Sequence, residues 1–331
     1  MEASVLQDAL FTALKSKLQP SESLVDSVAA VLEVSTDSAY RRIRGDKELS
    51  LSELLKLSSR YNISLDHLSN NRLDAFCFYG KLANAKDFDF EDYMSSVVQQ
   101  TAYLASFKSK EFFYLSKDIP VFHYFHFQPF AAFKYYFWLK TILQVPQMQH
   151  VAIDLSNYPQ TIFEKGKKSL SYFNQLDTTE LWNIETVNST IRQIDFYNDA
   201  GFFKSKEDVW LVYDSFEKLI THIEQQAALG YKFNQGDSSK KPLGKFSLYF
   251  NEVIILDNSM LAITDNIKTA FLIHSAINFM LTNDTHFCDN MYRHVQALMR
   301  KSTLISSVSE RERSRFFKIV RDKIESRKKL L

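Results

Sequence analysis

The first 68 residues consist of short amphipathic segments, each bounded by residues that cap or stop a helix. Residues 3–18 carry an apolar stripe of leucines at every fourth position, namely Leu6, Leu10, Leu14 and Leu18. This spacing places the leucines on one side of a helix and predicts a buried face. Pro20 cannot continue a helix, so the first segment ends before it.

Further short segments follow at close intervals. Ser23 is expected to cap a second helix, and Ser35 and Gly45 are expected at the two ends of a third. Ser50 and Glu53 have the spacing of a capping box at the start of a fourth helix, which ends at Asn62. Ser64 is expected to start a last helical turn. The buried face of the fourth is drawn from Leu51, Leu54, Leu55 and Leu57. The sequence therefore predicts a compact all-α domain.

Glycine and proline are scarce, with seven and six residues among 331. All-β folds with many turns are therefore disfavoured, and the chain is expected to be mainly α. The length allows two domains. Long aromatic-rich segments begin after Arg72, so residues 1–72 are expected to form the small domain. Residues 73–331 are expected to form a larger, mostly helical α+β domain with a small antiparallel β-hairpin or sheet.

The elements of this larger domain follow from periodicity and turn residues. Helices are expected over 88–107, 129–143, 159–174, 178–198, 205–230, 267–282, 287–301 and 310–329, the last capped by Ser309. Residues 111–126 favour an extended chain that Pro120 interrupts. Residues 245–256 and 260–264 are expected to form a β-hairpin around Asp257-Asn258-Ser259.

The third short helix carries three arginines within four residues. If Ala39 and Ile43 point inward, an advance of about 100° per residue places Asp37, Arg41 and Arg44 on the opposite face. Planar guanidinium groups on a rigid helix suit the recognition of phosphate and guanine. Hydroxyls and free backbone N–H groups at the start of such a helix suit a phosphate or a base edge.

The stretch VAAVLEVSTDSAYRRIRGDKELSLSELLKLSSRYNISLDHL resembles the helix-turn-helix of the Cro and lambda-repressor type, the XRE family of bacterial transcriptional regulators. The resemblance covers residues 24–68 and implies that the third helix lies in the major groove of DNA. It implies base-reading roles for Ser35, Thr36, Tyr40, Arg41 and Arg44. Asp37 would accept from a cytosine or order Arg41, and Lys47 would lie near the DNA backbone.

Two positions depart from the family pattern. Glu33 stands where the turn usually has glycine, and Arg42 stands where an apolar residue is usual, with Ile43 expected to take over the packing. Residues 1–72 contain nine Lys/Arg and ten Asp/Glu, so no general basic field covers the domain. The alternative to DNA contact is therefore that the arginines are solvated or paired with Asp37, Asp46 and Glu48.

Residues 73–331 contain none of the usual catalytic motifs, and neither a catalytic residue nor a metal or cofactor is predicted. His123 and His126 have no third ligand nearby, and His286, Cys288 and Asp289 are an incomplete ligand set. Asp284 and Asp289 have no visible acid or base partner.

Aromatic side chains are concentrated between Phe107 and Trp138. Most are expected in the core, and the remainder are candidates for a ligand cavity or a dimer surface. The segment 300–331 has eleven Lys/Arg against four Asp/Glu. Its apolar side consists of Phe316, Phe317, Val320 and Ile324, so the basic side is expected in solvent, with DNA flanks or another subunit as alternatives.

Composition also bears on the compartment. The two cysteines, Cys77 and Cys288, fit a reducing environment, and neither a signal peptide nor an apolar membrane span is evident. A cytoplasmic protein is therefore expected, with no membrane partner. The formal net charge of +1 neither indicates nor excludes a polyanionic partner.

The sequence thus predicts a sequence-specific transcriptional regulator that binds double-stranded DNA as a homodimer. The larger domain would dimerise and sense a small apolar ligand or a protein effector. Two alternatives stay open: a protein-interaction scaffold whose helix-turn-helix no longer binds DNA, and an enzyme in residues 73–331.

Overall fold

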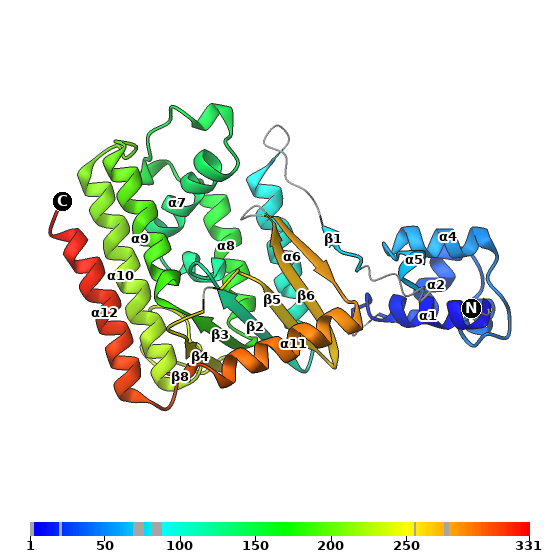
Figure 1. Cartoon of the computed structure of the whole chain (residues 1–331). Helices are drawn as coiled ribbons and strands as arrows, with labels where there is room; N and C mark the ends of the chain where they lie inside the picture. Colours follow the sequence, from blue (N-terminus) through cyan, green and yellow to red (C-terminus); the bar gives the residue numbers. More distant parts are fainter. Residues whose placement is uncertain (1–2, 20–21, 69–75, 81–87, 255, 275–277) are drawn as a thin grey trace. The chain divides into compact units, whose positions relative to one another are not determined.

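The computed structural model describes residues 3–19, 22–68, 76–80, 88–254, 256–274 and 278–331. The chain divides into two compact units, Met1–Phe78 and Tyr79–Leu331 (Figure 1). The boundary expected at Arg72 lies outside the described residues.

The first unit has the short helices that the capping pattern predicts. They are α1 (Ala3–Lys15), α2 (Leu24–Leu32), α3 (Thr36–Ile43), α4 (Leu51–Arg60) and α5 (Leu65–Leu68). The side chains of Ser23, Ser35 and Ser50 accept hydrogen bonds from the N–H groups three residues on, and the Ser50–Glu53 capping box is complete. Leu10, Leu14, Val28, Ala39 and Leu57 form the centre of the core.

The second unit is built on a mixed eight-stranded sheet, so the mainly α fold class predicted from the sequence is wrong and the unit is an α/β fold. The strand order is β1-β7-β6-β5-β2-β3-β4-β8. β2 pairs in parallel with β3, and β3 with β4, whereas the other neighbours are antiparallel. The bounds are β1 (Tyr79–Gly80), β2 (Lys110–Ser116), β3 (Asp177–Trp182), β4 (Phe246–Phe250), β5 (Met260–Thr264), β6 (Ile267–His274), β7 (Asn278–Thr282) and β8 (Thr303–Leu304).

Three of the expected elements are corrected. The hairpin of 245–256 with 260–264 does not form, because β4 pairs with β3 and β8 while β5 pairs with β2 and β6. Residues 267–282 contain the antiparallel strands β6 and β7 in place of a helix. The helix expected over 178–198 begins only after β3, a central strand in which Glu180, Leu181 and Trp182 are all buried.

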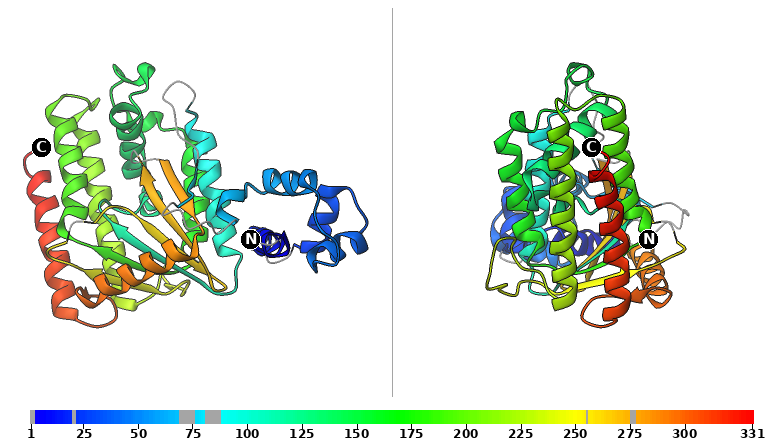
Figure 2. Two further views of the ribbon diagram at one scale, coloured as in Figure 1. Left: turned by 45° about the vertical axis from the view of Figure 1, so that its right-hand side comes forward. Right: turned by 90° about the vertical axis from the view of Figure 1, so that its left-hand side faces the viewer.

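The strands alternate their side chains between two apolar layers. Phe112 and Tyr114 of β2 belong to the main core, which lies on the side of six helices, and Phe113 and Leu115 face α11 (Thr285–Arg300) on the other side (Figures 1 and 2). The six helices are α6 (Phe90–Ala105), α7 (Gln128–Phe137), α8 (Gln160–Phe173), α9 (Ile184–Asp199), α10 (Lys206–Leu229) and α12 (Glu310–Lys328). Because both faces are covered, the central strands are apolar on both sides.

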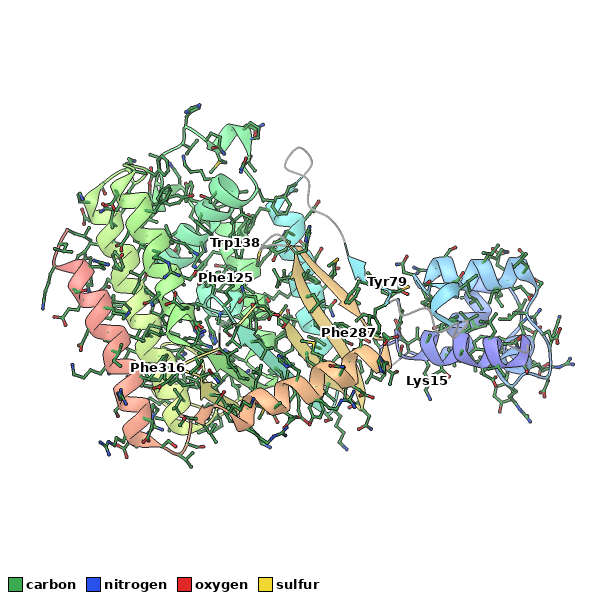
Figure 3. The ribbon with its side chains drawn as sticks, in the orientation of Figure 1. Lys15, Tyr79, Phe125, Trp138, Phe287 and Phe316 are labelled. Atoms are coloured by element: carbon green, nitrogen blue, oxygen red, sulfur yellow. The ribbon has the colours of Figure 1, made fainter. Side chains whose placement is uncertain are left out.

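The aromatic segment between β2 and α8 lies inside the helical layer. A 3₁₀ helix, Val121–His126, follows Pro120 where an extended chain was expected, and a π-helical turn, Trp138–Ile142, continues α7. Phe125 and Trp138 are 4% and 7% exposed, so the expectation of a largely buried cluster is confirmed for them (Figure 3).

The basic helix α12 packs its apolar side against the unit, as expected. Phe316, Phe317, Val320 and Ile324 are buried, and α12 lies along α10 (Figure 2). Several of its cations pair with carboxylates of the same unit: Arg321 with Glu224, Arg327 with Asp195, and Lys328 with Asp214 and Glu217. Ser309 is left-handed, with φ of 53°, and its side chain caps nothing, so the predicted cap is wrong.

Gly166 of α8 provides a test of this packing. A Cβ atom at this position would overlap the ring of Phe125 in the 3₁₀ helix. Gly→Ala inside a helix normally stabilises by about 1 kcal/mol. Here we expect Gly166→Ala to destabilise by about 1–3 kcal/mol, because the core must absorb an extra methyl group.

Urea unfolding followed by tryptophan fluorescence measures the effect, since Trp138, Trp182 and Trp210 all lie in this unit. Lys168→Ala, at an exposed site on the same helix, is the control and should change stability by less than about 0.5 kcal/mol. A Gly166→Ala protein as stable as wild type would contradict the packing.

Candidate functional site

Helix α3 is a short element fixed on one side by the core of the first unit. Ser35 caps it, with its Oγ accepting from the Ser38 N–H at 3.3 Å, and Ala39 at its centre is fully buried. Gly45 follows with φ of 79°, a conformation that favours glycine. The N–H of Lys47 then returns to the Arg41 carbonyl at 3.2 Å, which closes the C-terminal end.

The structure places all seven predicted DNA-contacting residues on the exposed surface: Ser35, Thr36, Asp37, Tyr40, Arg41, Arg44 and Lys47. Within the helix, Asp37, Tyr40, Arg41 and Arg44 lie within about 100° of arc, so they share one face. The Arg44 guanidinium lies 5.7 Å from the centre of the Tyr40 ring. Asp37 and Arg41 form no ion pair with each other among the described residues, so the ordering of Arg41 by Asp37 is not seen here.

Arg42 differs from its two neighbours, because its side chain is only 4% exposed. Its guanidinium donates to Glu53 Oε1 at 2.6 Å, to Ser38 Oγ at 2.6 Å and to the Ser38 carbonyl at 3.0 Å. The hydrogen bond from Arg42 is the main cause that lowers the pKa of Glu53. Arg42 therefore joins α3 to the start of α4 and is not part of the exposed face.

Gln7 provides a second link that sequence reasoning did not single out. Its Nε2 donates to the carbonyls of Arg42 and Lys47, at 2.7 and 2.9 Å, and its Oε1 accepts from the Leu49 N–H at 2.8 Å. The loop after α3 is therefore held to α1 by one buried amide. A lone polar residue on the apolar face of the first helix was the available signal.

The turn before α3 forms without glycine. Glu33 has φ of 58° at the C-cap of α2, and its N–H and that of Val34 both return to the Ala29 carbonyl. The left-handed conformation costs a non-glycine residue about 1 kcal/mol. The two hydrogen bonds to the Ala29 carbonyl at the C-terminal end of α2 offset this cost.

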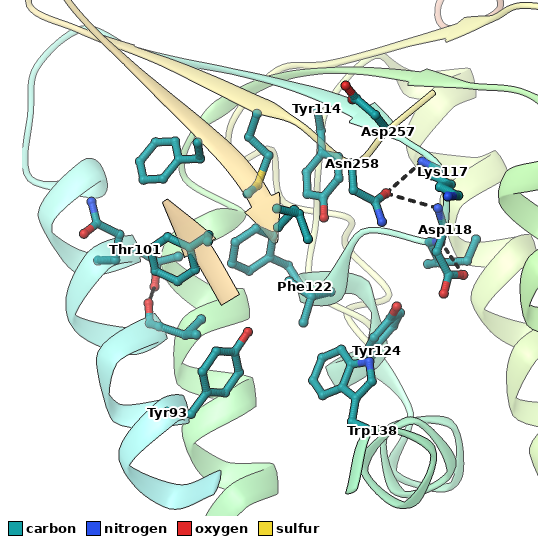
Figure 4. A pocket seen from close by; sticks show the side chains of 18 of the residues that line it. Tyr93, Thr101, Tyr114, Lys117, Asp118, Phe122, Tyr124, Trp138, Asp257 and Asn258 are labelled. Atoms are coloured by element: carbon teal, nitrogen blue, oxygen red, sulfur yellow. Dashed lines mark hydrogen bonds between the residues drawn. The ribbon is translucent and has the colours of Figure 1, made fainter. Parts of the chain in front are cut away.

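The second unit contains a separate candidate site, a cavity of about 360 Å³ between α6, the 3₁₀ helix, the π-helical turn and the strands β2, β5 and β6 (Figure 4). Its walls are mainly apolar and include Phe112, Phe122, Phe137, Trp138, Met260 and Phe271. The aromatic segment flagged by the sequence supplies part of this lining. Tyr93, Met260 and Phe271 come from distant segments that no local pattern connects to it.

A closed polar network lies at one end of the cavity. Lys134 is 1% exposed and its Nζ donates to Asp118 Oδ2, Thr190 Oγ1 and Gln193 Oε1 at 2.8 to 2.9 Å. Thr190 and Gln193 in turn donate to Asp118. Burial lowers the pKa of Lys134, and the Asp118 carboxylate opposes this effect. The Asp118 carboxylate is thus fully engaged in structural contacts.

Of the residues considered as metal ligands, His123, Cys288 and Asp289 have other contacts, whereas neither ring nitrogen of His126 has a hydrogen-bond partner among the described residues. His123 Nε2 lies 2.8 Å from Glu180 Oε1, and both side chains are fully buried. Cys288 Sγ lies 3.4 Å from the Thr282 carbonyl, and Asp289 pairs with Lys268 at 2.8 Å. The described residues contain no group of three or more His, Cys, Asp or Glu arranged to hold a metal. None of the helices in the described ranges has the length and apolarity of a membrane span.

Comparison of the chain with protein-family models, with curated proteins and with solved structures found no match.

The ion pair between Arg42 and Glu53 predicts a difference between neighbouring arginines. Arg42→Ala leaves a partly buried carboxylate without its partner, so we expect a loss of about 1–3 kcal/mol in the opening free energy of α3 and α4. The Arg44 side chain is 60% exposed and lies 3.9 Å from Asp46, so Arg44→Ala should change the opening free energy of α3 and α4 by less than about 0.5 kcal/mol. Amide hydrogen exchange of peptides from the full chain measures this free energy in both variants.

The same pair has a defined pH dependence. Since the pKa of Glu53 is lowered in the folded state, its stabilising effect is present above the unfolded value of 4.5 and is lost as the pH falls below it. The difference in protection between wild type and Glu53→Gln should therefore shrink on acidification from pH 7. A difference that grows in acid would contradict the assignment.

Proposed function

We propose that the chain is a sequence-specific DNA-binding transcriptional regulator that inserts α3 into the major groove. The observation that carries this proposal is the division of the three crowded arginines. Arg42 is buried and pairs with Glu53 inside the unit, whereas Arg41 and Arg44 lie on an exposed face with Tyr40. Their guanidinium groups have the forked donors that read guanine and phosphate.

The surroundings of α3 support the proposal. A recognition element must hold its side chains in a fixed geometry, and α3 is tied to α4 through Arg42 and to α1 through Gln7. Ser35 and Thr36 stand exposed at its N-terminal end, where backbone N–H groups favour an anion such as a DNA phosphate. Lys47 is exposed beyond its other end and would contact the DNA backbone.

DNA selection from a random duplex library tests the proposal with the full chain. We expect Arg41→Ala and Arg44→Ala each to weaken binding to the selected site by about 1–3 kcal/mol if they read a base. A residue that contacts only phosphate should instead weaken binding uniformly and reduce the salt slope by about one.

Arg60→Ala is the matched control, because Arg60 is an exposed arginine of the same unit on α4. It removes the same charge and should leave site preference unchanged. Unchanged DNA affinity of the Arg41→Ala/Arg44→Ala double variant would overturn the proposal.

We further propose that the regulator acts as a homodimer through Tyr79–Leu331. One helix of eight residues buries little surface, and specific regulators usually combine two half-sites about one helical turn apart. Light scattering on the full chain should therefore give twice the 38.6 kDa of one chain. The selected DNA should contain two related half-sites; a single half-site bound by a monomer would contradict the dimer.

A protein-binding scaffold is the second candidate, and the surface of α4 favours it. Leu51 and Leu55 are 71% and 49% exposed, although both were candidates for the buried face of this helix. Exposed leucines one turn apart suit a protein partner. If the chain is a scaffold, the Arg41→Ala/Arg44→Ala variant would still bind its protein partner, and the Leu51→Ser/Leu55→Ser variant would not.

A further inference from the structure

The wall of the cavity in the second unit carries hydrogen-bond donors that have no partner among the described residues. Tyr124 is 4% exposed, and its hydroxyl has no hydrogen bond to any described residue. The same holds for the hydroxyl of Tyr93 and for the indole N–H of Trp138 within the described part of the chain. These donors lie on the wall of the cavity, so a molecule bound there could supply their acceptor.

Tyr114 adds a third hydroxyl to the lining, and this residue is 4% exposed. Tyr93, Tyr114 and Tyr124 line the same cavity, and Figure 4 shows the three rings around one space. Burial raises the pKa of each, so all three stay protonated as donors.

The charges on the lining oppose a charged ligand. Asp118 is neutralised by Lys134, and Asp257 Oδ1 accepts from the N–H and the hydroxyl of Ser259. The one cation among the described lining residues is Lys117, which is exposed. An anion placed among the tyrosines would lose its hydration without gaining a counter-ion, and a cation would find the Asp118 carboxylate already paired with Lys134.

We infer that this cavity binds an uncharged, mostly hydrocarbon small molecule with a carbonyl or ether oxygen that accepts from the hydroxyls of Tyr93 and Tyr124. The apolar body of the ligand contacts the aromatic wall, and its oxygen faces the tyrosines. A volume of about 360 Å³ is at the lower end of ligand pockets, so the ligand is small. This deepens the effector part of the proposed function.

A neutral fluorescent ketone tests the inference. The probe is 6-propionyl-2-(dimethylamino)naphthalene, whose carbonyl is an acceptor and whose emission reports both polarity and hydrogen bonding. We expect saturable binding of one molecule per chain of the full-length protein. Naphthalene-2-sulfonate, an anion with the same ring system, should compete with the ketone at least about tenfold more weakly than neutral 2-acetylnaphthalene does.

Tyrosine-to-phenylalanine variants assign the binding to the cavity, because they remove the donor and keep the ring. Tyr93→Phe and Tyr124→Phe should each weaken binding of the ketone about 3- to 10-fold, as expected for one lost hydrogen bond. Tyr135→Phe is the matched control, since Tyr135 lies on α7 and outside the lining, and it should leave affinity unchanged.

Val97→Phe fills the cavity from α6 and should reduce binding more than tenfold in a protein whose circular dichroism is unchanged. If this variant does not fold, the phenylalanine variants still decide. Absence of saturable binding, equal affinity of all variants, or preference for the sulfonate would each overturn the inference. The assay contains no DNA, so its failure is distinct from failure of α3 to bind DNA.

Discussion

The buried cation Lys134 of α7 joins the loop after β2 to helix α9 in the second unit. Its three N–H donors meet three acceptors from two separate parts of the chain, the loop after β2 and helix α9. Removing a lysine from water is costly, so such a position persists only where its donors are fully satisfied. The network fixes the end of β2 against α7 and α9, and this is where the 3₁₀ helix turns back to close the cavity. It also cancels the charge of Asp118, which decides what kind of ligand the cavity can accept.

The first unit uses the same physical solution with different residues. Arg42 stands at a position that faces the core, and its charge is matched by Glu53 from the capping box of α4. An apolar residue there would serve packing, but it would not fix the angle at which α3 meets α4. The directional hydrogen bonds of a guanidinium group do so. In both units, then, a buried cation positions the element whose exposed or cavity-facing side chains are candidates for recognition.

The sequence predicted what is local and failed where partners are distant. Helices α1 to α5 were predictable because caps such as Ser35 and Ser50 act within three residues. β3 was read as the start of a helix, because its buried Glu180 looks like a solvated residue until its partners His123 and Trp182 are known. The pairing of β4 with β3 spans more than sixty residues of chain, so no turn signal could reveal it.

The candidate sites follow the same division. Helical geometry separated Arg41 and Arg44 from Arg42, because the period of a helix is fixed in advance. It could not find Glu53 as the partner of Arg42, although a charge at an inward position requires one. The cavity was even harder to predict from the sequence, because Tyr114 and Tyr124 belong to the dense aromatic segment whereas Tyr93 is supplied by α6. Only the tertiary fold shows which of many aromatic residues keep a free hydroxyl.

Unpartnered donors distinguish the two sites in a way that bears on specificity. The guanidinium groups of Arg41 and Arg44 are hydrated when nothing is bound, so each contact with a partner replaces a contact with water. Tyr114 and Tyr124 are each only 4% exposed, and a bound ligand that lacks an acceptor would leave their hydroxyls unsatisfied. Binding of a ligand without an acceptor therefore carries a larger free-energy penalty in the cavity than on the helix. Discrimination on α3 must instead come from several weak contacts held in register, which is why the rigid attachment of α3 through Arg42 and Gln7 matters as much as the side chains that it presents.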